Sequence, residues 1–103
     1  MQWHFTDGWD LGDLSEVVTF SDSTELTADQ KRPFIVATAS AASKTLVLDL
    51  AVGDVAFVAN VGGTNAFTLK NVSGDSGTSL ATGKVAIVIA SQTANASKVY
   101  VLN

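Results

Sequence analysis

Apolar and polar side chains alternate along most of the chain after residue 33, and this period of two is the pattern of β-strands. The clearest segment places Leu46, Leu48 and Leu50 on one face. Another segment directs Phe67 and Leu69 inward. Turns rich in Gly, Ser, Thr, Asn and Asp separate these segments. The pattern therefore predicts an all-β domain.

The alternating segments are short and recur at intervals of about ten residues. They predict strands at residues 16–20, 34–38, 45–51, 55–61, 66–72, 79–81, 85–90 and 98–102. Residues 24–32 are the only helix-compatible stretch, in which Thr27 caps a single turn and Pro33 ends it. Short strands at this spacing predict a small β-sandwich or jelly-roll-like domain.

Two of the predicted strands are apolar on both faces, at residues 34–36 and 85–89. Such strands either lie at the centre of a sheet or turn their outer face toward another subunit. Strand-rich domains of this size often protect their edges by associating. The sequence therefore predicts a homo-oligomer, with a trimer as the preferred state.

The N-terminal residues follow a different pattern. Residues 1–15 mix aromatic residues with Gly and Asp and sustain neither a helical nor a strand period. We predict an extended N-terminal arm at residues 1–24, which includes a possible first strand, followed by the sandwich domain at residues 25–103. The expected partner-binding anchors of the arm are its large apolar side chains, Trp3, Phe5, Trp9, Leu11 and Leu14. The alternative is that these side chains fold back onto their own domain.

Charge divides the chain in a similar way. The first thirty residues carry seven acids and no Lys or Arg, whereas the rest of the chain carries all six bases. The formal net charge of −4 and the pI near 4.5 argue against general nucleic-acid binding, which needs a basic surface. Without cysteine we expect no disulfide, and without a long apolar run we expect neither a signal peptide nor a membrane span.

Candidate reactive groups are few. The Gly-Asp-Ser-Gly tetrapeptide at residues 74–77 is similar to the nucleophile loop of trypsin-like proteases, but that chemistry needs a histidine base, and the only histidine is His4. We interpret the tetrapeptide as a turn. Asp7, Asp10 and Asp13 offer oxygen ligands, but the aromatic residues between them favour a contact segment over a calcium site. We therefore predict no catalytic residue, no metal and no cofactor, and we expect the protein not to be an enzyme.

Several short motifs in residues 25–103 resemble those of a known β-module. They are Leu26-Thr27-Ala28-Asp29, Thr45-Leu46-Val47-Leu48, Gly53-Asp54-Val55, Val58-Ala59-Asn60-Val61-Gly62, Phe67-Thr68-Leu69-Lys70-Asn71, Ser79-Leu80-Ala81-Thr82-Gly83-Lys84-Val85 and Val99-Tyr100-Val101. The module recurs in virion proteins of tailed bacteriophages, among them capsid decoration proteins, head fibres and tail-associated proteins. In such modules the penultimate aromatic residue is often Trp, where this chain has Tyr100. The resemblance implies a sandwich-like fold, a virion location and frequent trimers, and it implies no catalytic residue.

The expected function is that of a structural virion protein, a capsid decoration (cement) protein that binds the outer capsid surface and stabilises it. Its expected partners are the major capsid protein and further copies of the chain, with no nucleic acid and no membrane. We expect synthesis in the host cytoplasm and a final location on the capsid exterior. The alternative is a head- or tail-fibre module that binds a host surface glycan. An arm that becomes ordered on binding favours the first function.

Overall fold

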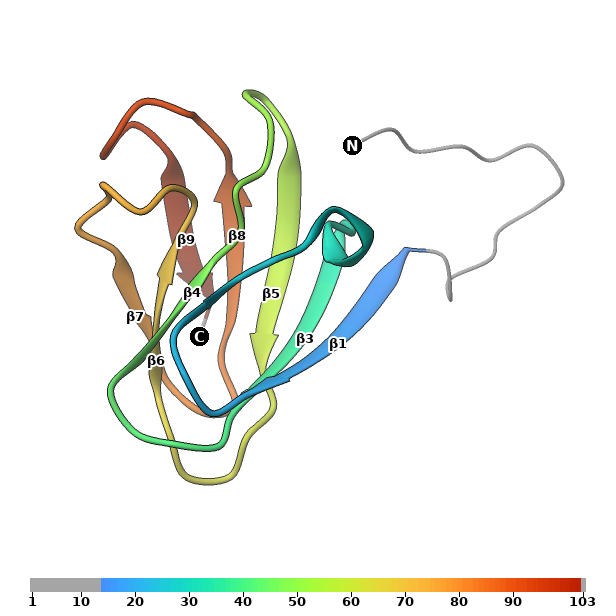
Figure 1. Cartoon of the computed structure of the whole chain (residues 1–103), viewed down its shortest axis with the longest axis vertical. Coiled ribbons are helices and arrows are strands. Elements are labelled where there is room, and N and C mark those ends of the chain that lie inside the picture. The colour runs from blue at the N-terminus through green and yellow to red at the C-terminus, as the bar shows by residue number, and fades with distance from the viewer. Residues whose placement is uncertain (1–13, 103) are drawn as a thin grey trace, which may run out of the picture.

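The structure, a computed structural model that describes residues 14–102, consists of two stacked β-sheets (Figure 1). One sheet has five strands in the order β1-β3-β5-β8-β9, and the other has four in the order β2-β4-β6-β7. The strands are β1 (Ser15–Phe20), β2 (Thr24–Glu25), β3 (Phe34–Ala39), β4 (Lys44–Val47), β5 (Val55–Asn60), β6 (Phe67–Lys70), β7 (Thr78–Leu80), β8 (Val85–Ile89) and β9 (Lys98–Leu102). The predicted all-β sandwich is confirmed.

The first six strands alternate between the two sheets. Each pass of the chain adds one strand to each sheet, and neighbouring strands from successive passes pair in parallel. This winding resembles the coils of a β-helix. The last three strands pair antiparallel, β7 with β6, β8 with β5 and β9 with β8. The sandwich thus differs in its connections from a jelly roll, whose strands are antiparallel throughout.

β1 is an edge strand of the five-stranded sheet and belongs to the sandwich. It pairs with β3 along its whole length, and its inward side chains Val18 and Phe20 are part of the core. The predicted strand at residues 16–20 is therefore present. The sandwich begins before residue 25, since residues 15–20 contribute both backbone pairing and core side chains.

A single 3-10 turn, η2 (Ala28–Gln30), links β2 to β3. Its entrance is fixed by the N–H of Thr27, which donates to Gln30 Oε1 at 2.9 Å, as in one half of a capping box. Pro33 follows three residues later and leads into β3. The prediction of one helical turn in this region is confirmed.

The core forms between the two sheets and is asymmetric in side-chain size. The four-stranded sheet and its ends supply bulky side chains, Leu46, Leu48, Leu50, Phe67, Leu69 and Leu80. The five-stranded sheet supplies mainly smaller ones, among them Ala37, Ala39, Ala56, Ala86, Val58 and Val88. Large side chains on one sheet opposite small ones on the other allow the two layers to pack closely. The predicted shared face of Leu46, Leu48 and Leu50 and the predicted inward direction of Phe67 and Leu69 are correct.

The strand predicted at residues 45–51 ends earlier, at Val47. Asp49 has a φ of +52°, a left-handed conformation that interrupts the strand. The backbone nevertheless continues beside β6, because the N–H of Leu48 donates to the carbonyl of Lys70 at 2.9 Å. Leu48 and Leu50 therefore still reach the core together with Leu46, with which the alternation grouped them.

Candidate functional site

The outward-facing side of the five-stranded sheet carries two continuous rows of side chains that are almost entirely apolar. The strand registers align each row across all five strands. The first row is Ser15, Phe34, Phe57, Ile87 and Tyr100, and the second is Val17, Val36, Ala59, Val85 and Leu102. We call these ten residues the outer face. It contains no Asp, Glu, Lys or Arg.

Several large apolar side chains of this sheet point outward, while Ala37, Ala56 and Ala86 point into the core. Val17 is 71% exposed, Tyr100 55% and Leu102 45%. The ring of Phe34 stacks on that of Phe57, with centroids 5.3 Å apart. Burying one such side chain stabilises a protein by about 1.5–3 kcal/mol. Because several of them are exposed here, the single chain lacks a large part of the stabilisation that their burial would provide. Sheets with parallel strands are normally covered on both faces, which makes the outer face a candidate interaction surface.

The Gly-Asp-Ser-Gly tetrapeptide forms a structural loop, as the interpretation as a turn predicted. The Asp75 carboxylate is buried and accepts three backbone N–H groups, from Asn71 at 3.0 Å, Val72 at 3.1 Å and Asn95 at 2.6 Å. Gly77 has a φ of +85°, and a Cβ at this position would overlap the side chain of Thr68. Asp75 and Gly77, the two residues of the tetrapeptide described here, therefore both stabilise the conformation of the loop.

Acidification is expected to weaken this loop. Burial alone would raise the pKa of Asp75, but hydrogen bonds from the backbone N–H groups of Asn95, Val72 and Asn71 outweigh it, and the pKa lies below its usual value. A lowered folded-state pKa stabilises the fold above the unfolded-state pKa of about 3.9, and the contribution is lost as the pH falls through the folded-state value. We expect Asp75→Asn to lower the unfolding free energy at pH 7 by about 2 kcal/mol.

Urea unfolding of wild type and Asp75→Asn between pH 7 and pH 2 checks this expectation. The difference between the two proteins should shrink below about pH 4. Asp22→Asn is the matched control, since the Asp22 side chain is 92% exposed. A difference that stays constant down to pH 2 would show that the charge of Asp75 is not what holds the loop.

An ion pair bridges η2 and the segment after β4. Lys31 Nζ lies 3.2 Å from Asp49 Oδ2, and Gln92 also donates to this carboxylate. The hydrogen bond from Lys31, followed by that from Gln92, lowers the pKa of Asp49. The three residues line an open hollow of about 480 Å³. Because both charged side chains are partly exposed, the pair contributes about 0–1 kcal/mol, and we assign it a structural role.

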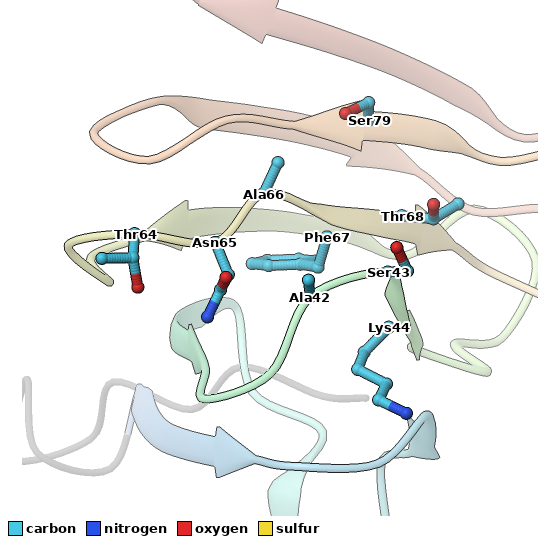
Figure 2. A pocket seen from close by; sticks show the side chains of 9 residues that line it. All are labelled: Ala42, Ser43, Lys44, Thr64, Asn65, Ala66, Phe67, Thr68 and Ser79. Carbon is cyan, nitrogen blue, oxygen red and sulfur yellow. The ribbon is translucent and has the colours of Figure 1, made fainter.

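A second hollow, of about 340 Å³, lies at β4, β6, β7 and the adjoining loops (Figure 2). Hydroxyl, amide and ammonium groups line it, from Ser43, Lys44, Thr64, Asn65, Thr68 and Ser79. Its only aromatic lining residue, Phe67, is 2% exposed because the ring packs into the core. The hollow thus offers polar groups without an aromatic surface on which a sugar ring stacks.

The predicted anchors divide into two groups. Trp3, Phe5, Trp9 and Leu11 lie outside the described residues, as do His4, Asp7, Asp10 and Asp13. Leu14 is described, and at 8% exposure it is buried in the structure. Leu14 directly precedes β1, and its role as a partner-binding anchor stays a prediction.

Within residues 14–102, no three metal-ligating side chains of His, Cys, Asp or Glu lie close together. The same residues include no helix long and apolar enough to cross a membrane. The sequence pattern marked two strands of the outer face, at residues 34–36 and 85–89, as apolar on both sides, but it left open which side faces the core. Comparisons of the chain with protein-family models, with curated proteins and with solved structures found no match.

Proposed function

We propose that the protein is a structural, non-enzymatic component of a virion, a decoration protein that binds the exterior of a capsid and reinforces it. The observation that carries this proposal is the outer face, two apolar rows that cross five strands without a charged side chain. Contiguous apolar patches of several hundred Å² are typical of surfaces that bind other proteins. The resemblance of residues 25–103 to a tailed-phage virion module supports the choice of partner.

The proposed partners are the major capsid protein and further copies of this chain, arranged as a trimer. The outer face suits such contacts because apolar groups can be buried there without desolvating a charge. The paired rings of Phe34 and Phe57 supply the aromatic anchor that interface centres commonly use. Reinforcement then follows from a rigid sandwich that bridges neighbouring capsid subunits.

Substituting Ile87 with aspartate is expected to weaken attachment by about tenfold or more, because the carboxylate would have to be desolvated in the interface. Occupancy on particles, counted by electron cryomicroscopy at a fixed protein concentration, measures the effect. Val52→Asp is the matched control, since Val52 is 72% exposed and lies off the outer face. Equal occupancy for Ile87→Asp and wild type would contradict a docking role for the face.

The polar hollow in Figure 2 favours one other function, a head- or tail-fibre module that binds a host glycan. Its hydroxyl and amide groups suit hydrogen bonding to sugar hydroxyls. Protein density at the end of a fibre, with attachment inhibited by free glycan, would support this function over capsid decoration. The decoration proposal predicts density on the capsid exterior and no inhibition by glycan.

A further inference from the structure

Strand β9 forms an edge of the five-stranded sheet that the opposite sheet leaves partly uncovered. The five-stranded sheet has one strand more than the sheet packed against it, and β9 is the strand at its end. The register places Val101 beside Ala86, which points into the core, yet Val101 is 36% exposed whereas Ala86 is fully buried. Tyr100 and Leu102, on the outer face, are also exposed. β9 therefore carries accessible apolar side chains on both of its faces.

The other edge strands have features that discourage pairing with another chain, and β9 lacks them. Short edge strands and inward-pointing charges are two such features. β1 has Glu16, which the register places beside the buried Ile35, and the edges of the four-stranded sheet are short, two residues in β2 and three in β7. β9 has five residues, and its one charge is on Lys98 at its start. Within residues 14–102, no strand pairs with its free edge. β9 is therefore the edge best suited to accept a further strand.

The sequence of β9 is complementary to itself in an antiparallel arrangement. When Tyr100 lies opposite Tyr100 of the partner subunit, Val99 lies opposite Val101 of the partner subunit. Lys98 then lies opposite Leu102 of the partner subunit, and the two lysines are more than about 13 Å apart, beyond the Debye length of about 8 Å at physiological ionic strength. A parallel pair in the same register would place the two lysines side by side, where like charges are destabilising. The charge pattern therefore favours an antiparallel second copy.

We propose that two copies of the chain associate through β9, which pairs antiparallel with β9 of the partner subunit around Tyr100. The pairing satisfies backbone groups at the free edge and covers the exposed side chain of Val101. It joins the two five-stranded sheets into one sheet and leaves the outer face of each copy open. The inference goes beyond the proposed function, since it does not depend on which partner binds the outer face.

The expected association is weak. A pair of strands about 17 Å long is a small contact, below the roughly 1,200 Å² of standard specific interfaces. We therefore expect monomer and dimer to be in equilibrium at micromolar concentrations. A covalent trap is the most direct way to detect such a contact.

A single introduced cysteine tests the arrangement, because the chain has no cysteine of its own. At the centre of the pair, the two copies of residue 100 have Cα atoms about 4.5–5.5 Å apart, within the range that a disulfide spans. Leu102→Cys is the matched control, on the same strand and the same face with similar exposure, but its two copies lie more than about 13 Å apart. Under mild oxidation we expect Tyr100→Cys to form a covalent dimer at least about tenfold faster than Leu102→Cys does.

Val101→Lys tests the same contact without altering the outer face. Its ammonium group would lie next to Lys98 of the partner subunit, so pairing is expected to weaken by about tenfold or more. Sedimentation over a series of concentrations measures the association, and far-UV circular dichroism verifies that the variant keeps its β-structure. Val52→Lys adds the same charge at an exposed position off β9 and should leave the association unchanged.

The outcomes are distinct. Faster crosslinking of Tyr100→Cys, reduced to the control rate when Val101→Lys is added, supports the proposal. Equal crosslinking of Tyr100→Cys and Leu102→Cys overturns it, and so does association of the wild type that Val101→Lys leaves unchanged. Failure of the protein to decorate particles would refute the proposed function without affecting this result.

Discussion

Replacing Asn71 with alanine is expected to lower the free energy of unfolding by about 3–5 kcal/mol, although the residue belongs to no hydrophobic cluster. Its side chain is fully buried and makes three hydrogen bonds to backbone. Nδ2 donates to the carbonyls of Leu50 at 3.2 Å and Ser91 at 2.8 Å, and Oδ1 accepts the N–H of Leu50 at 2.9 Å. The substitution would leave the N–H of Leu50 without a partner inside the protein, and it would remove one of two donors from each carbonyl, since Gln92 also donates to Leu50 and Ser97 also donates to Ser91.

The loss is expected to be large because Asn71 holds together the segments that follow β4, β6 and β8. No other described side chain bonds to both Leu50 and Ser91. Urea denaturation at pH 7 measures the effect, with Thr64→Ala as a control on an exposed loop. A loss below about 1 kcal/mol would mean that water replaces the amide, since ordered water can satisfy such groups at little cost.

Phe67→Ala should have a comparable effect, a loss of about 3–5 kcal/mol typical of a buried Phe→Ala substitution. Phe67 lies on β6, is 2% exposed and meets Phe20 of β1 edge to face, with ring centroids 5.4 Å apart. This pair joins the two sheets directly. Removing the ring would leave a cavity between layers that backbone hydrogen bonds cannot close.

Phe57→Ala provides a matched comparison, because Phe57 also belongs to an aromatic pair but lies on the outer face. Its loss of stability is expected to be about 1–2 kcal/mol, the scale of an aromatic pair at the surface with modest burial. Thermal or urea unfolding of both variants distinguishes the two environments. Equal losses would mean that Phe57 is as well covered in solution as Phe67, which would contradict an exposed outer face.

The fold has a consequence for how the protein associates. β1 and β9 form the two edges of the five-stranded sheet, and both border the outer face. An apolar face between two edge strands favours association with a partner.

Much of the secondary structure could be predicted from the sequence. Alternation and the turn residues between segments predicted each strand of more than two residues that residues 14–102 contain, since side chains on a strand point to opposite faces with a period of two. Alternation also predicted that Phe67 and Leu69 point inward. Thr27 and Pro33 were sufficient to predict the single helical turn.

Which strands pair, and which apolar face is covered, became known only from the three-dimensional structure. Alternation fixes the two faces of a strand but says nothing about its neighbour, so the parallel winding of the first six strands could not be read from it. In β5 and β8 both faces are apolar, and the smaller residues Ala56 and Ala86 face the core because the leucines of the opposite sheet fill that space. The role of Asn71 depends on Leu50 and Ser91, which are distant in sequence and meet it only when the winding is complete.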